Sequence, residues 1–304
     1  MSPEAHWADA AVEDLARVSR ALSPALRRRV DAALGRIARM NGAASLREAL
    51  TRPASTPFVA LIDAAAQDLG LAGDPRVALL GRATVLEYAY VRLQDDLVDE
   101  PDLVDRASVY AAEALLAEHL RLFAAAAPVP AAFAWRGDIM RRFADVAATE
   151  VDDRGAELSD EDLSWMGEKF LAMAVPLAAM AVIAGREARA QVMVDLVRET
   201  GCALQLVNDV YNVAEDALAG RSTPLLRWLR AEGVDARSPT IRARLFETRS
   251  LARALCEAQR SVDRATSRAT AAELPQLAAV IARVRSMVDL APDRLCRLML
   301  GVSV

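Results

Sequence analysis

Two groups of oxygen-bearing side chains stand out in the sequence because each follows a long apolar segment. The first contains Asp95, Asp96 and Asp99 in LQDDLVDE, and the second runs from Gln205 to Asp216 as QLVNDVYNVAED. Carboxylate and amide oxygens suit Mg²⁺, which proteins usually hold with a few carboxylates and the phosphates of a substrate. The two groups therefore predict a magnesium site that binds a diphosphate.

The first group is more crowded than a purely structural helix would be. Asp95, Asp96, Asp99 and Glu100 place four carboxylates within six residues at the C-terminal end of a helical segment. Neighbouring like charges repel one another, and the helix dipole disfavours negative charge at this end. Either this is a hydrated helix end, or a cation binds there, with Asp95 and Asp99 on one helix face and Asp96 beside them.

The second group spreads its oxygen ligands along one helix face over two turns. At about 100° per residue, Asn208 and Asn212 lie about 40° apart around the axis, and Asp209 and Asp216 about 20° apart. We expect the two groups to face each other across the mouth of a cavity, above an apolar pocket for a hydrocarbon tail. Mg²⁺ there would neutralise a departing diphosphate, so that a carbon–oxygen bond ionises without a protein nucleophile.

The elements that position these groups are predicted to be helices. Apolar residues recur at i, i+3, i+4 and i+7 along most of the chain, and no alternating strand pattern is visible. Prolines and glycines divide this pattern into helices expected at about 8–21, 24–40, 57–70, 75–99, 103–125, 130–151, 159–185, 188–217, 222–232, 240–271 and 275–300, the last with a break near Pro292. The sequence therefore predicts an all-α fold, a single domain over residues 1–304 with about ten or more helices around a deep central cavity.

Composition narrows the class of protein further. Apolar residues make up 54% of the chain and glycines number only 13, which favours helices. A net charge of −5 with dispersed arginines argues against nucleic acid as a partner. Three isolated cysteines and two isolated histidines exclude a zinc site or a disulfide framework, and they fit a reducing, cytoplasmic location.

The most apolar segment is expected to be a buried helix and not a membrane span. Residues 170–185 read FLAMAVPLAAMAVIAG, contain Pro176 and fall short of the ~20 residues that cross a bilayer. The N-terminus carries acids where a signal peptide needs a basic start and an apolar run. The sequence thus predicts a soluble protein.

Both acidic groups resemble motifs of the trans-prenyl diphosphate synthases. LQDDLVDE is similar to the first aspartate-rich motif of that family, and GCALQLVNDVYNVAEDALAGRSTPLL is similar to the second. Lys169-Phe170 stands where the family has a diphosphate-binding Lys-Thr. The resemblance covers about residues 57–230. It implies the class I isoprenoid synthase fold, a homodimer, an allylic prenyl diphosphate as substrate and three Mg²⁺ ions as cofactor.

The resemblance also implies a role for each residue of the site. The implied residues are the metal ligands Asp95, Asp99, Asn208, Asn212 and Asp216, supported by the catalytic Asp96 and Asp209; the diphosphate-binding Lys169, Arg221 and Arg106; and the substrate-pocket residues Tyr88, Phe170, Gln205 and Tyr211. The pocket floor, which would set substrate length, is expected near residues 88–92. Arg92 itself is expected to form an ion pair or lie at the surface, and it is assigned no role in the site.

The sequence departs from the family where a second diphosphate would bind. Val104-Asp105, with Arg106 beyond, replaces an Arg-Arg pair, and only Arg52-Pro53 remains of a Gly-Lys-Arg stretch. Each lost charge-assisted contact costs about 1.5–3 kcal/mol, so a second diphosphate would be held weakly. Asn208 and Asn212 replace aspartates, in partial resemblance to the Asn-Ser-Glu metal motif of class I terpene synthases.

Three functions are compatible with this pattern. The first is a terpene synthase, a lyase that ionises one allylic diphosphate and lets the carbocation cyclise or react with water. Few aromatic residues, 5% of the chain, are available to stabilise such a cation. The second is an atypical prenyltransferase or prenyl diphosphate synthase that joins the cation to a second substrate. The third is a non-catalytic subunit that regulates a true synthase, although such a subunit has no need to keep the acidic residues.

Overall fold

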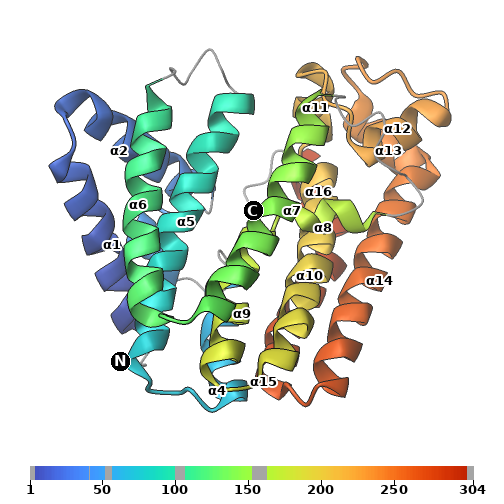
Figure 1. Ribbon diagram of the computed structural model, residues 1–304. Helices are drawn as coiled ribbons and strands as arrows, with labels where there is room; N and C mark the ends of the chain where they lie inside the picture. The colour runs from blue at the N-terminus through green and yellow to red at the C-terminus, as the bar shows by residue number, and fades with distance from the viewer. Residues whose placement is uncertain (1–3, 41, 52–56, 100–106, 153–162, 300–304) are drawn as a thin grey trace. The chain divides into compact units, whose positions relative to one another are not determined.

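The all-α prediction is confirmed by the structure, a computed structural model that describes residues 4–40, 42–51, 57–99, 107–152 and 163–299 (Figure 1). Over these ranges there are sixteen α-helices, two short 3-10 helices and no strand. The elements are α1 (Glu4–Ala21), α2 (Pro24–Met40), α3 (Leu46–Thr51), α4 (Pro57–Leu69), α5 (Pro75–Asp99), α6 (Ser108–Ala126), α7 (Pro130–Asp152), α8 (Ser164–Glu168), η1 (Leu171–Ala174), α9 (Val175–Ile183), η2 (Glu187–Arg189), α10 (Ala190–Tyr211), α11 (Val213–Leu218), α12 (Pro224–Ala231), α13 (Ile241–Glu247), α14 (Arg249–Ala271), α15 (Pro275–Asp289) and α16 (Ala291–Met299).

The helices belong to two compact units. Unit 1 comprises Met1–Ile139 and Ala172–Met193, and unit 2 comprises Met140–Leu171 and Val194–Val304. The first acidic group therefore belongs to unit 1 and the second to unit 2. The single domain, the central cavity and the two groups facing each other across its mouth stay predictions.

Unit 1 is organised around the neighbouring helices α5 and α6, which run side by side in opposite directions (Figure 1). Leu80, Leu86 and Leu93 of α5 are completely or almost completely buried in its core. Helix α1 can approach α5 closely because Gly81 has no side chain; a Cβ there would lie 2.7 Å from the ring of Trp7. Burial of these apolar side chains stabilises the helix that carries the first acidic group.

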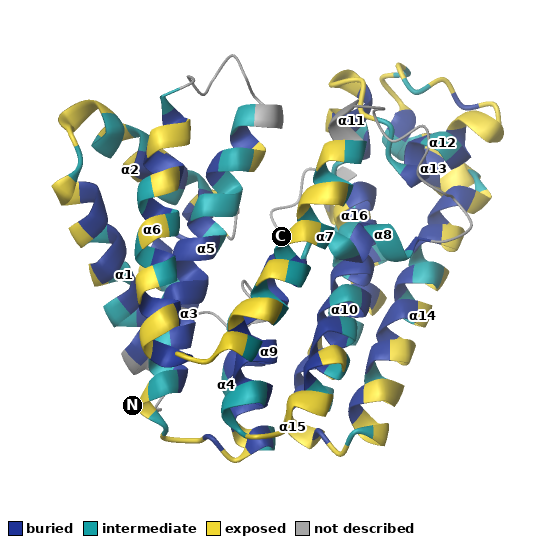
Figure 2. Cartoon of the chain, viewed as in Figure 1, coloured by how far each residue is buried: buried dark blue, intermediate teal, exposed yellow. Residues whose placement is uncertain are grey.

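Unit 2 contains the neighbouring helices α14 and α15, with α12 and α13 against α14. The buried face of α14 follows a helical spacing and is visible in Figure 2 as a buried stripe beside exposed residues; it consists of Ser250, Leu251, Ala254, Ala258, Ser261, Val262, Ala265 and Ala269. Helix α10 is tied to α14 by Arg264, whose Nε donates to Oε2 of Glu199 at 2.9 Å. These contacts fix the helix that carries the second acidic group.

The expected helix over 159–185 is divided in the structure, and this corrects the prediction. Its described part consists of α8, the 3-10 helix η1 and α9, with an interruption at Lys169 and Phe170. Pro176 lies in the first turn of α9, where a missing backbone N–H has little cost. Residues 175–181 are all buried, which confirms a buried core helix. None of the helices in the described part of the chain is both long and apolar enough to span a bilayer.

Other parts of the helix prediction also differ from the structure; for example, α1 begins at Glu4 and not near residue 8. Helix α3 was not expected, the segment 188–217 is interrupted at Asn212, and the segment 240–271 is interrupted at Thr248. Thr248 has an extended backbone (φ −113°, ψ 168°) before α14 begins. Glu232 is the C-cap residue of α12. Its carboxylate accepts a hydrogen bond from the backbone N–H of Arg249 at 2.9 Å, and this satisfies one of the unpaired N–H groups at the start of α14.

A buried polar cluster joins α5, α6 and α7 in unit 1. Glu87 and His119 have no exposed surface, and Arg136 reaches both of them. Arg136 donates from Nε to Nε2 of His119 at 3.0 Å and from Nη2 to Oε1 of Glu87 at 3.3 Å. His119 Nδ1 lies 2.9 Å from the carbonyl oxygen of Ala83. Because Nε2 accepts from Arg136, His119 is neutral and donates its Nδ1 proton to Ala83.

Burial shifts the pKa values of Glu87 and His119 in opposite directions. It raises the pKa of Glu87 from 4.5 to about 8, against the positive charge of Arg136. Burial lowers the pKa of His119 from 6.5 to about 4, although the bond to Ala83 opposes the shift. On folding, Glu87 therefore takes up a proton between pH 4.5 and 8, whereas His119 releases one between pH 4 and 6.5.

These opposite shifts predict that the protein loses stability as the pH rises from 6.5 to 8. In this window only the folded state keeps a proton on Glu87, so the free energy of unfolding should fall by about 2 kcal/mol. Urea unfolding followed by circular dichroism at several pH values measures the slope. Glu87→Gln should remove it. Glu118→Gln should keep it, because Arg121 and Arg17 lower the pKa of Glu118 to about 2.

Candidate metal and diphosphate site

The first acidic group ends α5, in unit 1. The side chain of Asp95 is 46% exposed, whereas that of Asp96 is 0% exposed. Asp99 is the last residue of α5, and its side chain lies outside the described residues, as does all of Arg106. The two neighbouring acids Asp95 and Asp96 therefore have different environments, and only Asp95 is open to a ligand from solvent.

Two arginines neutralise the described carboxylates of this group. Arg92, one turn before them on α5, contacts Oδ2 of Asp95 through Nη1 at 2.7 Å and Oδ1 of Asp96 through Nη2 at 2.7 Å. Arg36 of α2 donates from Nε to Oδ2 of Asp96 at 2.9 Å, and its Nη2 contacts the same oxygen. Two guanidinium groups thus balance two carboxylates, which offsets the repulsion expected from the sequence.

The second acidic group, in unit 2, forms side-chain pairs four residues apart. Gln205 donates from Nε2 to Oδ1 of Asp209 at 2.8 Å, and Asn212 donates from Nδ2 to Oδ1 of Asn208 at 3.0 Å. Asp209 is 1% exposed, whereas Asn208 is exposed. The spacing deduced from the sequence predicted that Asn208 and Asn212 share a helix face, which the structure shows, whereas the pair of Gln205 and Asp209 was not predicted.

Arg221 contacts Asp216 because the chain turns at Gly220. Gly220 adopts φ +71°, a left-handed conformation that ends α11 and is costly for other residues. The backbone N–H of Arg221 then donates to the carbonyl oxygen of Asp216 at 2.9 Å, and Nη1 lies 3.2 Å from Oδ1. Burial raises the pKa of Asp216, while the charges of Arg221 and Lys169 lower it.

Two glycines allow the segment around Lys169 to pack closely against α10. A Cβ at Gly167 would lie 1.9 Å from the carbonyl oxygen of Arg198, and a Cβ at Gly201 would lie 2.7 Å from the side chain of Phe170. The short helix α8 and the residues after it can therefore lie directly on the α10 backbone. Lys169 follows α8 directly, and its charge lowers the pKa of Asp216.

The residues predicted to line the substrate pocket are half-buried. Tyr88 and Tyr90 lie on α5, Phe170 lies against Gly201, and Gln205 binds Asp209. The Tyr211 hydroxyl is buried, and burial raises its pKa against the effect of Arg294 of α16. The role of these residues in holding a hydrocarbon chain stays a prediction.

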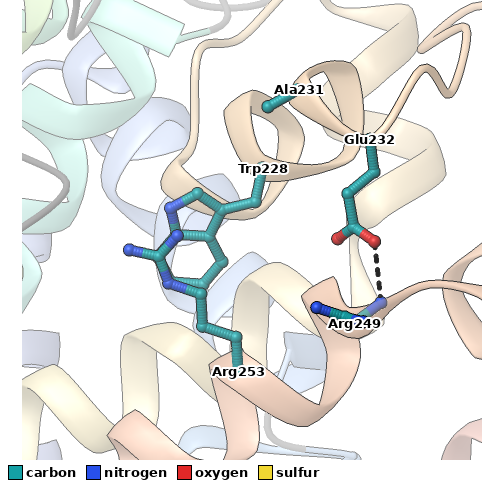
Figure 3. Close-up of a pocket in the computed structure, with 5 residues that line it drawn as sticks. All are labelled: Trp228, Ala231, Glu232, Arg249 and Arg253. Carbon is teal, nitrogen blue, oxygen red and sulfur yellow. Dashed lines mark hydrogen bonds between the residues drawn. The ribbon is translucent and has the colours of Figure 1, made fainter.

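A pocket of about 410 Å³ lies between α12 and α14 of unit 2 (Figure 3). Its lining consists of Trp228, Ala231, Glu232, Arg249 and Arg253. The Arg253 guanidinium lies 4.1 Å from the centroid of the Trp228 ring, a cation–π contact. No residue predicted for the substrate pocket lines it, so this pocket is distinct from the expected cavity.

The donors of both groups fit Mg²⁺ shared with a substrate. Among the described residues, no group of three or more His, Cys, Asp or Glu side chains could hold a metal ion by itself. Mg²⁺ does not require one, because it keeps several waters and takes one or two carboxylates together with phosphate oxygens. The exposed carboxylate of Asp95 and the amides of Asn208 and Asn212 are suitable hard oxygen donors.

Sequence reasoning missed the two arginines of the first group. Arg92 was expected to form an ion pair, and it does, but its contact with both Asp95 and Asp96 was not foreseen. Its spacing of three and four residues from these acids is the signal that could have identified it. Arg36 lies sixty residues from Asp96 in the sequence, and no local pattern connects the two.

Comparisons with known proteins give one consistent result. No family model and no curated protein sequence match this chain. Heptaprenyl diphosphate synthase from Staphylococcus aureus matches with a TM-score of 0.64 and 13% identity, over 93% of this chain and 98% of that chain. Geranylgeranyl pyrophosphate synthetase from the archaeon Geoglobus acetivorans matches with a TM-score of 0.60 and 14% identity, over 89% and 98%. An Arabidopsis medium/long-chain length prenyl pyrophosphate synthase in its apo form matches with a TM-score of 0.60 and 17% identity, over 78% and 91%.

At sequence identities this low, the similarity to these proteins is a similarity of fold. The three proteins are prenyl diphosphate synthases by name, and each is covered over more than nine-tenths of its length. The chain therefore has the class I isoprenoid synthase fold that is found in prenyl diphosphate synthases.

Proposed function

We propose that the chain binds an allylic prenyl diphosphate with Mg²⁺, breaks its carbon–oxygen bond and transfers the prenyl group to a second substrate. One observation of unit 2 carries the proposal. Asp216 lies beside Arg221 and within the electrostatic reach of Lys169, next to the amide pair of Asn208 and Asn212. Hard oxygen donors beside two cations are the combination that a magnesium diphosphate requires.

The residues have complementary roles in this proposal. Lys169 and Arg221 bind oxygens of the diphosphate, and Asp209 is held in place by Gln205. The residues that would hold Mg²⁺ are Asp95 and Asp99 in the first group and Asn208, Asn212 and Asp216 in the second. Bound Mg²⁺ supplies compensation for the negative charge that develops on the departing diphosphate. The electron pair of the broken bond leaves with the diphosphate, and an allylic cation remains.

Transfer is preferred to cyclisation because of the proteins that share the fold. The solved structures that share it are named as synthases of prenyl diphosphates. In transfer, the π electrons of an alkene or another electron-rich acceptor form the new bond to the allylic carbon, and the adduct loses a proton. Prenyl transfer therefore requires a second substrate.

A terpene synthase is the second candidate, and the second acidic group favours it. Asn208 and Asn212 stand where elongating synthases have aspartates, and the Arg-Arg pair after the first motif is missing. A terpene synthase would need only one diphosphate and would release a hydrocarbon or an alcohol. The homodimer, implied by the resemblance, and the cytoplasmic location, inferred from the isolated cysteines, are likewise proposals.

The products distinguish the two candidates. Purified protein with Mg²⁺ is incubated with geranyl, farnesyl or geranylgeranyl diphosphate, each alone and with isopentenyl diphosphate or a neutral alkene acceptor. Mass spectrometry of organic extracts, after phosphatase treatment, identifies the products. Transfer predicts a longer or joined product only when the acceptor is present. A hydrocarbon or alcohol formed without any acceptor would establish the terpene synthase instead, and no turnover of any diphosphate would contradict both.

A further inference from the structure

Arg92 connects an exposed carboxylate with a buried one. Its Nη1 contacts Asp95, whose side chain is 46% exposed, and its Nη2 contacts Asp96, whose side chain is 0% exposed. Both distances are 2.7 Å, and the Arg92 side chain is 18% exposed. The guanidinium is a rigid planar fork, so its two nitrogens can serve two carboxylates at once.

The buried side of this arrangement is fixed by a second helix. Asp96 accepts a hydrogen bond on Oδ2 from Arg36 of α2, while its buried Oδ1 has an ion-pair contact of 2.7 Å with Nη2 of Arg92 that lacks hydrogen-bond geometry. A carboxylate with no exposed surface and two guanidinium partners would lose both if it became a metal ligand. The contact of Arg92 with Asp96 is therefore the permanent one, and its contact with exposed Asp95 is the one that a ligand can replace.

We propose that Arg92 is a tethered counter-ion that couples metal binding to diphosphate binding at the first acidic group. This inference rests on the proposed function. Before ligands bind, Nη1 of Arg92 neutralises Asp95. When Asp95 takes up Mg²⁺, Arg92 stays attached to Asp96 through Nη2, and its released Nη1 donates to the diphosphate that arrives with the metal. Asp96 and Arg36 are positioning residues that hold Arg92 in reach.

This arrangement makes the metal and the diphosphate depend on each other. Mg²⁺ alone must compete with Arg92 for Asp95, so it binds weakly. With diphosphate present, the displaced guanidinium gains a charge-assisted hydrogen bond to a phosphate oxygen, so the metal binds more tightly. The chain would thereby select the magnesium diphosphate complex over the free metal ion.

Mn²⁺ binding to the full chain tests the proposal without any turnover. Electron paramagnetic resonance measures the affinity for Mn²⁺, first alone and then with saturating inorganic diphosphate. In Arg92→Gln, Mn²⁺ alone should bind about two- to fivefold more tightly, because its competitor at an exposed carboxylate is gone. With inorganic diphosphate it should bind about tenfold or more weakly than in the unchanged protein, because one charge-assisted contact is lost.

Three further variants complete the test. Arg92→Lys keeps the charge but cannot contact both carboxylates with one rigid group, so its coupling should lie between the two extremes. Arg36→Gln loosens the tether and should also reduce the coupling. Arg82→Gln is the matched control, because Arg82 is on the same helix and pairs with Asp14 at 2.7 Å. It should leave both Mn²⁺ affinities unchanged.

The outcomes separate this inference from the proposed function. If Asp95→Ala loses Mn²⁺ binding in the presence of diphosphate while Arg92→Gln and Arg92→Lys keep the original coupling, the inference is wrong and the proposed site stands. If Asp95→Ala binds Mn²⁺ and diphosphate as before, the proposed metal site is wrong, and the role of Arg92 fails with it. Should Arg92→Gln not fold, as judged by circular dichroism, Arg92→Lys decides: full coupling in that variant overturns the inference.

Discussion

Asp95→Ala is expected to reduce diphosphate release from an allylic prenyl diphosphate by about a thousandfold. The change removes the exposed carboxylate of the first acidic group while leaving the buried pair of Asp96 and Arg36 intact. Without this ligand, less positive charge is available to stabilise the departing diphosphate in the transition state. The rate of diphosphate formation at saturating Mg²⁺ measures the effect, with kcat and KM determined separately.

The matched control for this variant is Asp289→Ala. Asp289 also lies at the end of a helix, α15, and its side chain is 48% exposed. Its Oδ1 lies 3.7 Å from Nε of Arg285 and accepts an exposed hydrogen bond from Gln259 at 3.1 Å. Loss of such a surface pair should change neither rate nor stability measurably. Equal losses of activity in both variants would point to a general effect of removing surface charge and not to a metal ligand.

Asp209→Asn extends the same test to the second acidic group. Asp209 is 1% exposed, so asparagine, which keeps its shape, is a safer replacement than alanine. A similar loss of diphosphate release is expected, with unchanged helical content. Full activity in both Asp95→Ala and Asp209→Asn would move the metal site elsewhere in the chain.

The helices were predictable where their apolar pattern is long and local signals mark their ends. Helix α5 begins at Pro75 and ends at Asp99, as expected from the pattern and from Pro101 beyond it. The segment 159–185 was predicted less well, because it is interrupted at Lys169 and Phe170, where the apolar pattern gives no sign of a break. Periodicity reports which face of a segment is buried, and it does not report where a neighbouring backbone comes too close for a continuous helix.

The same distinction applies to the candidate site. The pairs Gln205–Asp209 and Asn208–Asn212 are separated by four residues, so helix geometry alone predicts them. Arg36 reaches Asp96 only because α2 packs against α5 in unit 1. The different environments of Asp95 and Asp96, adjacent in the sequence, also follow from this packing. Sequence spacing therefore predicted side-chain pairs four residues apart on one helix, whereas the arginine partners of the first group required the fold.

Gly167→Ala is expected to destabilise unit 2 by about 3 kcal/mol. The new Cβ would lie 1.9 Å from the carbonyl oxygen of Arg198, and a backbone atom cannot move aside as a flexible side chain can. Helix α8 would have to shift away from α10, against the bond of its Glu168 to Arg142, whose Nη2 and Oε1 lie 2.6 Å apart. Because Lys169 follows directly, its charge should act less on Asp216, and diphosphate release should fall as well.

Gly137→Ala is the matched control for this change, since Gly137 is a helical residue of α7 with nothing within 4 Å of an added Cβ. There the substitution should be neutral or should stabilise by up to about 1 kcal/mol, because alanine favours a helix. Urea and thermal unfolding of both variants give the comparison. If Gly167→Ala is as stable as Gly137→Ala, then α8 does not lie on the α10 backbone, and the argument that places Lys169 near Asp216 loses its basis. A destabilised Gly167→Ala with normal activity would instead separate the packing of α8 from the binding of diphosphate.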